Sequence, residues 1–436
     1  MRWKTDTYTG WGRVHSATGE LARPERLSHL AAIAASEPAP AIGRCRSYGD
    51  ACLNDEGRAV DTSRLDRVLS FDPETGLMEA EAGLRLGEIA RLYAPKGWLP
   101  AVMPGTGFAT VGGAIAMDVH GKNHHHAGSF GQHVTEITLL QGDKTVTVTP
   151  KDEGLFKATV GGLGQTGIIA SAKLQLQRCK GDLMMVTERR ATDWDAFIDL
   201  LDRSEATYTV GWIDATATGK ELGRGILEEG ETGAGLVPAP KRSKSVPFNA
   251  PQAALSAPVV RTFNTLYYSR VPKSGRTTVK PIQDFFFPLD RIHDWNKLYG
   301  KTGFHQFQCV VPLDQAPALR EMMARIAKSG LASPLAVLKR MGPGRAGYLS
   351  FPMEGYTLAV DFPNRGRAEA LIAELEKMTS DAGGRIYFAK DALSSGLYVD
   401  EMYPDLPLWQ AEAAKADPNG ALKTDLVRRL KLRDAS

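Results

Sequence analysis

The sequence is poor in cysteine and has no long apolar run. Its 4 cysteines, Cys45, Cys52, Cys179 and Cys309, form no C-x-x-C pair. This spacing argues against a disulfide framework and indicates free thiols in a reducing compartment. No stretch of about 18 apolar residues occurs, so we expect no transmembrane helix. The first residues lack an apolar core, so we also expect no secretion signal. The chain is therefore expected to be cytoplasmic or peripheral at the inner membrane.

The charge of the chain is small and nearly balanced. The formal net charge is +3, with 43% hydrophobic and 24% charged residues. These proportions are typical of a globular protein. A nucleic-acid binder would carry a concentrated basic face, so no nucleic-acid partner is expected. A length of 436 residues exceeds the usual size of a single core and indicates two or three domains.

Hydrophobic periodicity predicts a mixture of helices and strands without internal repeats. Helical spacing occurs at 25–36, 84–93, 368–378 and 422–433. Strand-like segments lie at 39–42, 77–82, 134–140, 145–149, 168–177, 207–213, 306–311, 356–361 and 385–389. The leucine stripe of the last helix is expected to face a core or, alternatively, a membrane surface. The character of the sequence changes near residue 180, which predicts a domain boundary there.

A proline-rich, basic segment interrupts the second half of the chain. Residues 229–258 contain five prolines together with Lys241, Arg242 and Lys244. A loop this long inside a folded domain predicts a mobile lid or a disordered insertion. Its basic residues suit a contact with anionic lipid head groups.

Glycine is concentrated in two segments, GRCRSYGD at residues 43–50 and a longer one at residues 103–131. Glycine permits positive φ angles and lets backbone N–H groups approach a ligand closely. In the first segment, the Arg46 guanidinium suits a diphosphate, although such a segment alone also fits an ordinary polar turn. Together, the two segments predict a clamp for a large anionic cofactor.

Two further patterns are rejected as sites. Gly162–Gly167 matches G-x-G-x-x-G but leads into the β-branched pair Ile168-Ile169. A Rossmann motif would instead open a helix. The adjacent residues His124, His125 and His126 point to alternating sides of an extended chain, so we expect no metal site there.

A few polar residues carry candidate chemistry, each with two interpretations. His120, within the second glycine segment, is either a functional histidine or a hydrogen-bonded structural one. Lys390 follows apolar residues and is either an amine with a lowered pKa or half of a surface salt bridge with Asp391. Gln306 and Gln308 share one strand face and suit either a polyol or a solvent-facing strand edge.

The motifs GRCRSYGD, PGTGFATVGGAIAMDVHGKNHHHAGSFG, VGGLGQTGII and YFAKD occur in this order. Together they resemble flavoproteins of the vanillyl-alcohol-oxidase superfamily, with PCMH-type FAD-binding domains. Within it, the chain is most similar to the decaprenylphosphoryl-β-D-ribose oxidase group, over nearly its whole length. The resemblance implies an α+β fold. A two-lobed FAD-binding domain would comprise residues 1–178, completed by 370–436. A substrate domain, 179–369, would hold an antiparallel sheet covered by helices.

The resemblance also implies the residues of the site. FAD would be bound without a covalent link, because Tyr48-Gly49-Asp50 provides no histidine for one. The residues contacting FAD would be Gly43, Arg44, Cys45, Arg46, Ser47, Tyr48, Gly49, Asp50, Gly105, Thr106, Thr110, Val111, Gly112, Gly113, Met117, Asp118, Val119, His120, Ile169 and Tyr387. The catalytic residues would be Lys390, Tyr48 and His120. Sugar or phosphate would be bound by Trp11, Lys122, Gln306, Gln308, Lys339 and Lys390.

The implied reaction is oxidation of the 2′-hydroxyl of a lipid-phosphate-linked ribose to a keto sugar. A separate NAD(P)H-dependent reductase would then complete the epimerisation. The substrate side departs from the group at three positions: Ala359 replaces the cysteine of the mycobacterial members, Thr357 an asparagine and Phe286 a tyrosine. Two alternatives therefore stay open: oxidation of a soluble alditol, sugar lactone or nucleotide sugar, and a non-catalytic flavin-binding subunit.

Overall fold

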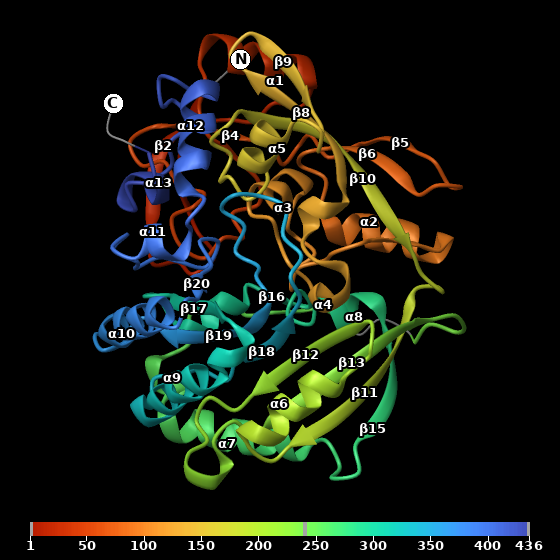
Figure 1. The fold of residues 1–436 in the computed structure, drawn as a ribbon, viewed down its shortest axis with the longest axis vertical. Coiled ribbons are helices and arrows are strands. Elements are labelled where there is room, and N and C mark those ends of the chain that lie inside the picture. The colour runs from red at the N-terminus through yellow and green to blue at the C-terminus, as the bar shows by residue number, and fades with distance from the viewer. Residues whose placement is uncertain (1–2, 239–241, 434–436) are drawn as a thin grey trace.

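The computed structural model describes residues 3–238 and 242–433. Figure 1 shows the N-terminal and C-terminal segments together in one half of the molecule. The other half is built around one large sheet. The predicted α+β class is confirmed, because helices accompany sheets whose strands are mostly antiparallel. No helix in the described part of the chain is long and apolar enough to cross a membrane.

The N-terminal half contains two smaller sheets. A four-stranded sheet has the order β1 (Lys4–Thr9), β2 (Ser16–Ala22), β4 (Arg58–Asp61) and β3 (Ala41–Ile42). A six-stranded sheet comprises β5 (Val68–Phe71), β6 (Leu77–Glu81), β10 (Ile168–Arg178), β8 (Val134–Gln141), β9 (Lys144–Val148) and, paired with β10, β7 (Trp98–Pro100). The accompanying helices are α1 (Leu27–Ser36), α2 (Leu86–Tyr93), α3 (Val111–Ala116), α4 (His124–Ala127) and α5 (Glu153–Thr159).

The large sheet has eight strands, and every neighbouring pair is antiparallel. Its order is β15 (Arg276–Pro281), β11 (Leu183–Ala191), β13 (Gly225–Gly233), β12 (Tyr208–Ile213), β18 (Ala336–Met341), β19 (Gly355–Pro363), β17 (Phe304–Val311) and β20 (Arg385–Ile386). Helices α6 (Trp194–Arg203), α9 (Ala316–Ser329) and α10 (Ala368–Asp381) cover one face of it (Figure 1). Asp193 caps α6 by accepting a bond from the Ala196 N–H at 3.0 Å, and Gly330 ends α9 at a positive φ.

The chain returns to the first half through short helices. These are α11 (Val399–Met402), α12 (Leu406–Ala416) and α13 (Asp425–Arg429). Trp409 of α12 is fully buried in the same apolar cluster as Phe307 of the large sheet. The last segment is therefore part of the core. Its leucines, Leu422, Leu426 and Leu430, are buried, which supports the core interpretation over a membrane contact.

Three expected boundaries need correction. The helix predicted at 422–433 covers only Asp425–Arg429, and the strand predicted at 385–389 covers only Arg385–Ile386 before the chain turns. The segment predicted as a loop at 229–258 begins inside β13 and ends inside α7 (Ala257–Ser269). It also contributes β14 (Lys244–Ser245), which pairs in parallel with β16 (Ile292–His293). Lys241 of that segment lies outside the described residues.

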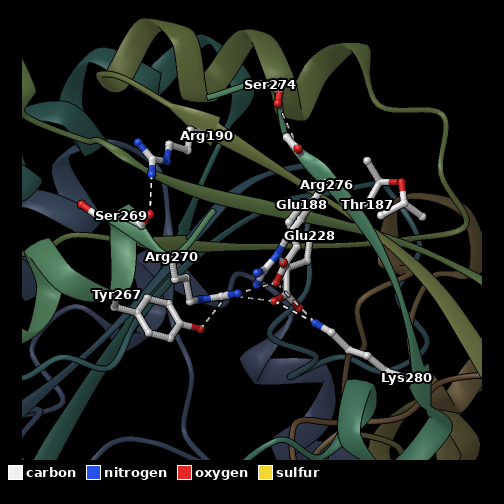
Figure 2. Close-up of polar contacts among 12 residues, drawn as sticks. Thr187, Glu188, Arg190, Glu228, Tyr267, Ser269, Arg270, Ser274, Arg276 and Lys280 are labelled. Carbon is white, nitrogen blue, oxygen red and sulfur yellow. Dashed lines mark hydrogen bonds and ion pairs between the residues drawn. The ribbon is translucent and has the colours of Figure 1, made fainter. Parts of the chain in front are cut away.

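An ion cluster around the buried Glu188 joins α7 to the large sheet (Figure 2). Glu188 of β11 is fully buried and pairs with Arg276, with Arg270 at 2.7 Å and with Lys280 at 3.4 Å. Glu228, directly opposite Glu188 on β13, pairs with Arg270 at 3.4 Å and Lys280 at 3.3 Å. The three cations come from the C-terminal end of α7 and from β15, so they join these elements to the sheet.

Candidate active site

The two glycine segments meet in space, as the sequence predicted for a clamp. A Cβ on Gly43 would lie 2.6 Å from Oγ1 of Thr110, so only glycine fits against this side chain. Thr110 in turn caps α3 by accepting a bond from the Gly113 N–H at 3.3 Å. A Cβ on Gly105 would meet no atom within 4 Å, so this part of the second segment faces open space. Both segments therefore border one region, with room for a ligand beside Gly105.

The backbone N–H groups at the start of α3 are already used. Val111 donates to the Leu84 carbonyl at 2.9 Å and Gly112 to the Ala82 carbonyl at 2.8 Å. These two amides hold α3 against the chain before α2. A cofactor bound at this point would therefore contact α3 through atoms other than these two amides.

Arg46 has an unsatisfied guanidinium. Its centre lies 4.1 Å from the Trp11 ring and 4.7 Å from the Phe108 ring. Its side chain makes no hydrogen bond or ion pair within residues 3–238 and 242–433, and Nε is buried. Burial lowers the pKa of Arg46, and nearby Asp290 opposes that shift. Such a guanidinium, close to two aromatic rings and without an ionic partner, fits an anionic group such as a diphosphate.

The side chains of two other predicted cofactor residues connect segments of the protein. Asp50 forms an ion pair with Arg429 of α13 at 2.7 Å, and Asp391 joins the same arginine at 2.9 Å. Asp118 is fully buried and accepts bonds from the Gly131 N–H at 2.8 Å and from Ser350. These carboxylates therefore hold segments together rather than facing open space.

The remaining predicted cofactor residues lie around the same region. Arg44 is exposed, and Cys45, at a positive φ of 47°, packs with Cys52 against Ile42. Thr106 donates to Asp290 at 2.8 Å. The Ser47 carbonyl accepts from the Trp11 N–H, the Met117 carbonyl from the Tyr387 hydroxyl and the Val119 carbonyl from the Phe130 N–H. Gly49 packs against the Asp391 backbone, and Ile169 is buried in β10.

Lys390 lies over the ring of Tyr48. Its Nζ is 3.6 Å from the centre of that ring, and the Tyr48 N–H donates to the Ala389 carbonyl at 2.9 Å. Asp391 is paired with Arg429 instead, so the structure excludes the surface salt bridge between Lys390 and Asp391. Burial lowers the pKa of Lys390, Asp361 opposes this, and Lys339 adds to the lowering. A neutral amine is therefore accessible near physiological pH.

The two glutamines point to two different polar partners. Gln306 donates to Asp361, the residue opposite it on β19. Gln308 lies 3.1 Å from Nε2 of His120 and donates to Thr357 at 3.3 Å. Strand β17 is flanked by β19 and β20. This position corrects the alternative interpretation of the glutamines as a solvent-facing strand edge.

His120 is buried against aromatic rings. Its ring centre lies 5.4 Å from that of Phe351 and 5.3 Å from that of Tyr387. Its Nδ1 is buried without a hydrogen-bond partner among the described residues. Burial, with the nearby cations Lys339 and Lys390, keeps the pKa of His120 well below its usual value. The imidazole is therefore neutral and has one nitrogen free for a ligand.

Two more lysines, both half-buried, lie near this histidine. Lys339 lies 3.4 Å from the Gly121 carbonyl, and burial followed by repulsion from Lys122 lowers its pKa to about 7. Burial lowers the pKa of Lys122 to about 8. Lys122 donates to the Phe285 carbonyl and lies over the Phe285 ring at 4.0 Å. Lys122, Lys339 and Lys390 thus form a row of half-buried amines, in which Lys122 lowers the pKa of Lys339 and Lys339 lowers that of Lys390.

The three adjacent histidines have separate roles. His124 is buried and its Nδ1 accepts from the Gly342 N–H at 3.1 Å, while His125 bonds the Ala206 carbonyl at 3.0 Å. His126 is exposed. No group of three or more potential metal ligands converges within the described ranges.

Sequence reasoning missed a buried hydrogen-bond network around Asp361 of β19. Asp361 is fully buried and accepts from the Tyr299 hydroxyl at 3.1 Å as well as from Gln306. Tyr299 also bonds Ser333 at 2.9 Å. The one available signal was an acidic residue inside the apolar strand LAVDF. Its partners come from distant segments, so spacing could not have identified them.

Comparison with known proteins now defines the class. Residues 21–150 match the FAD binding domain family, the segment that holds both glycine loops. The chain is therefore an FAD-dependent oxidoreductase acting on CH–OH groups, as the motifs predicted. The unpaired Arg46, the free His120 nitrogen and the open space at Gly105 fit such a cofactor.

Similarity over the whole chain then defines the family. The chain is 35% identical to decaprenylphosphoryl-β-D-ribose oxidase of Mycolicibacterium smegmatis, over 98% of both chains. An uncharacterized protein of Streptomyces coelicolor is 33% identical over 80% of this chain and 100% of its own. L-gulono-1,4-lactone dehydrogenase of Mycobacterium tuberculosis is 22% identical over 97% of this chain and 98% of its own. The chain belongs to the decaprenylphosphoryl-β-D-ribose oxidase family.

Proposed function

We propose that this protein oxidises the 2′-hydroxyl of a polyprenylphosphoryl-β-D-ribose to the 2′-keto sugar. The observation that carries the proposal is the half-buried amine of Lys390 over Tyr48, beside the first glycine segment, in a chain similar along its whole length to decaprenylphosphoryl-β-D-ribose oxidase. FAD, when bound, supplies the acceptor for the hydride of the carbinol carbon. We propose that it is held without a covalent link.

The protein's own residues divide the remaining work. Lys390 takes the hydroxyl proton, because its lowered pKa leaves part of the amine neutral. Gln308 and the neutral imidazole of His120 orient the sugar through hydrogen bonds. The aromatic faces of Tyr48 and Tyr387 exclude water and shape the site.

The phosphate of the substrate is the counter-ion of the amine row. Lys122 and Lys339 are half-buried, and no carboxylate forms an ion pair with either among the described residues. A phosphate next to the sugar supplies this missing negative charge and stabilises both ammonium groups. Trp11, stacked with Arg46, borders the same region.

We also propose the domain organisation and partners that this function requires. Residues 1–178 with the C-terminal segment form the FAD-binding part, and residues 179–369 form the substrate part. Strand β20 (Arg385–Ile386) pairs with β17 of the substrate part, so we propose that the chain returns to the FAD-binding part after residue 386. A separate NAD(P)H-dependent reductase reduces the keto sugar. Arg242 and Lys244 are exposed and suit an anionic membrane surface from which a lipid-linked substrate comes.

A soluble sugar lactone is a second candidate substrate. The similarity to L-gulono-1,4-lactone dehydrogenase covers 97% of the chain, and the substrate-side positions Ala359, Thr357 and Phe286 depart from the decaprenylphosphoryl-ribose group. This candidate requires no phosphate, so it leaves the charges of Lys122 and Lys339 without a counter-ion. The lipid-linked pentose is therefore preferred.

An anaerobic titration distinguishes these functions. Flavin absorbance should bleach with polyprenylphosphoryl ribose and stay unchanged with free ribose or with L-gulono-1,4-lactone. Lys390→Ala should retain FAD but lower the rate of flavin reduction at least about a hundredfold, the scale of lost acid–base catalysis. Bleaching by the lactone alone would establish the second candidate. If no alcohol bleaches the flavin, both candidates are wrong.

A further inference from the structure

The segment at residues 290–296 lies between the two glycine segments in its contacts, although it follows both by more than 150 residues in the chain. It comes directly after α8 (Ile282–Phe286) and the short turn that ends this helix. Arg291 of the segment pairs with Asp284 of α8 at 2.8 Å. The start of the segment is therefore fixed to a helix and can hold other parts of the chain in place.

Asp290 forms the contact with the second glycine segment. Its Oδ1 accepts from the Thr106 hydroxyl at 2.8 Å, and its Oδ2 accepts from the Gly107 N–H at 2.7 Å. The two donors directly follow Gly105, where an added Cβ would meet no atom within 4 Å. Hydrogen bonds to both oxygens of one carboxylate fix the direction of this backbone as well as its distance.

The same turn also packs against Gly107. A Cβ on Gly107 would lie 3.0 Å from the Phe287 ring and 2.8 Å from the Gly87 Cα of α2. The Gly107 carbonyl accepts from the Gly87 N–H at 2.9 Å, and the Asp290 N–H donates to the Phe287 carbonyl at 3.1 Å. The backbone at Gly107 is therefore held by α2 and by the turn that carries Asp290.

The end of segment 290–296 contacts Trp11. The Asn296 amide donates to the Trp11 carbonyl at 3.1 Å, and the rings of Trp295 and Trp11 meet edge to face with centres 5.6 Å apart. Trp11 is bound in turn to the first glycine segment, because its N–H donates to the Ser47 carbonyl at 2.7 Å. Segment 290–296 is thus connected to both glycine segments.

The two connections meet at Arg46. Its guanidinium lies 4.1 Å from the Trp11 ring and 4.7 Å from the Phe108 ring. Asn296 holds the residue that carries the first ring, and Asp290 holds the two residues that precede the second. Displacement of either end of the segment would therefore move a ring that borders this cation.

We propose that Asp290 and Asn296 are positioning residues for the cofactor site, which hold Thr106–Gly107 and Trp11 around Arg46 and thereby slow the loss of FAD. Neither side chain needs to contact the cofactor for this role, because groups that hold the contacting residues determine how precisely a site is formed. The inference rests on the match to the FAD binding domain family and not on the identity of the substrate.

The hydrogen bonds and the charge of Asp290 predict opposite effects on FAD. A carboxylate near the site repels an anionic cofactor, so loss of its charge alone would strengthen FAD binding. Loss of its hydrogen bonds would instead release the backbone at Thr106 and Gly107 and weaken FAD binding. The direction of the change in FAD release therefore separates the two roles.

The first test measures FAD release from the holoenzyme. Phosphodiesterase converts released FAD to the more fluorescent FMN, so the rise in fluorescence gives the dissociation rate. In Asp290→Ala, FAD should dissociate at least about tenfold faster, the scale of lost hydrogen bonds to a charged group. Asn296→Ala should also speed release. As a matched control, Asp294→Asn removes a carboxylate of the same segment that pairs with Lys297 at 2.9 Å, and its rate should stay within about twofold of wild type.

A double-mutant cycle shows whether Asp290 acts through Thr106. Thr106→Val removes the hydroxyl and keeps the shape of the side chain. It should speed FAD release from the otherwise wild-type protein but add little to Asp290→Ala, in which the bond is already absent. Equal effects in the two backgrounds would mean that the Thr106 hydroxyl acts on FAD independently of Asp290, contrary to the proposal.

The second test follows the backbone itself. Hydrogen exchange of peptides covering residues 103–109, read by mass spectrometry, should be faster in the Asp290→Ala holoenzyme than in wild type, because the Gly107 N–H loses its acceptor. Asp294→Asn should exchange like wild type. Faster exchange with unchanged FAD release would show a purely structural contact and overturn the proposal.

The remaining outcomes are also decisive. Unchanged or slower FAD release in Asp290→Ala overturns the proposal, and if this variant does not fold with FAD, Thr106→Val and Asn296→Ala decide in the same way. If the wild type retains its flavin covalently, the visible circular dichroism of the bound flavin replaces the release rate, and identical spectra in Asp290→Ala and wild type overturn the proposal. Failure of polyprenylphosphoryl ribose to bleach the flavin overturns only the proposed function.

Discussion

We expect Arg429 to hold the C-terminal segment against the first glycine segment. It pairs with Asp50 at 2.7 Å and Asp391 at 2.9 Å, and it donates to the Ser394 carbonyl at 2.6 Å. The carboxylate side chains are only 7% and 5% exposed, and together they raise the pKa of Arg429 above its usual value. One cation thus neutralises two buried anions, Asp50, which lies two residues after Tyr48, and Asp391, which directly follows Lys390.

Arg429→Ala should therefore destabilise the protein by about 3–5 kcal/mol, the usual cost of leaving a buried charge unpaired. Arg428 offers a matched control on the same helix. It pairs with Asp425 at 2.5 Å, but the two side chains are 44% and 24% exposed. Arg428→Ala should cost less than about 1 kcal/mol. Urea unfolding followed by far-UV circular dichroism and by flavin fluorescence measures both variants.

The two carboxylates supply an internal check. Without Arg429, they are buried close together without a counter-charge. Adding Asp50→Asn to Arg429→Ala should recover part of the loss. Equal losses in Arg429→Ala and Arg428→Ala would refute the reasoning.

Two further predictions concern the cofactor. Gly43→Ala brings its Cβ to 2.6 Å from Thr110 Oγ1, so the protein should lose FAD on gel filtration, whereas Gly366→Ala, with no atom within 4 Å of its Cβ, should retain it. Retention of FAD by Gly43→Ala would show that Thr110 can move aside. Acid precipitation should release all the yellow colour to the supernatant, and flavin remaining in the pellet would contradict non-covalent binding.

The sequence predicted the glycine segments and the strand pattern well because both depend on local rules. Alternation located β6, β8, β9, β10, β17 and β19 to within a few residues. The turn at Gly162–Gly167 was correctly separated from a Rossmann motif, because β10 follows it directly. Gly43 and Thr110 lie far apart in the chain. Their contact could still be expected, because both glycine segments were predicted to bind the same anionic cofactor.

The sequence could not predict which polar groups satisfy one another. Asp50 and Asp118 were predicted to contact the cofactor. In the structure, Asp50 forms an ion pair with Arg429 and Asp118 accepts a hydrogen bond from Ser350, and both partners lie hundreds of residues later in the chain. The sequence also could not decide whether Lys390 pairs with Asp391. The structure excludes this salt bridge because Arg429 of α13 pairs with Asp391. Ion pairs between distant segments depend on the tertiary fold, and local spacing carries no information about them.

The row of half-buried amines gives the strongest physical reason to prefer a phosphorylated substrate. Desolvation lowers the pKa of Lys339 to about 7, with repulsion from Lys122 adding to it, and lowers the pKa of Lys122 to about 8, although Glu228 opposes this second shift. A neutral sugar would leave the pKa values of Lys122 and Lys339 lowered. It would also leave Lys390 repelled by Lys339. A phosphate bound between Lys122 and Lys339 raises the pKa values of both and screens their charge from Lys390. Because Lys339 also lowers the pKa of Lys390, phosphate binding at Lys339 should be coupled to the basicity of Lys390.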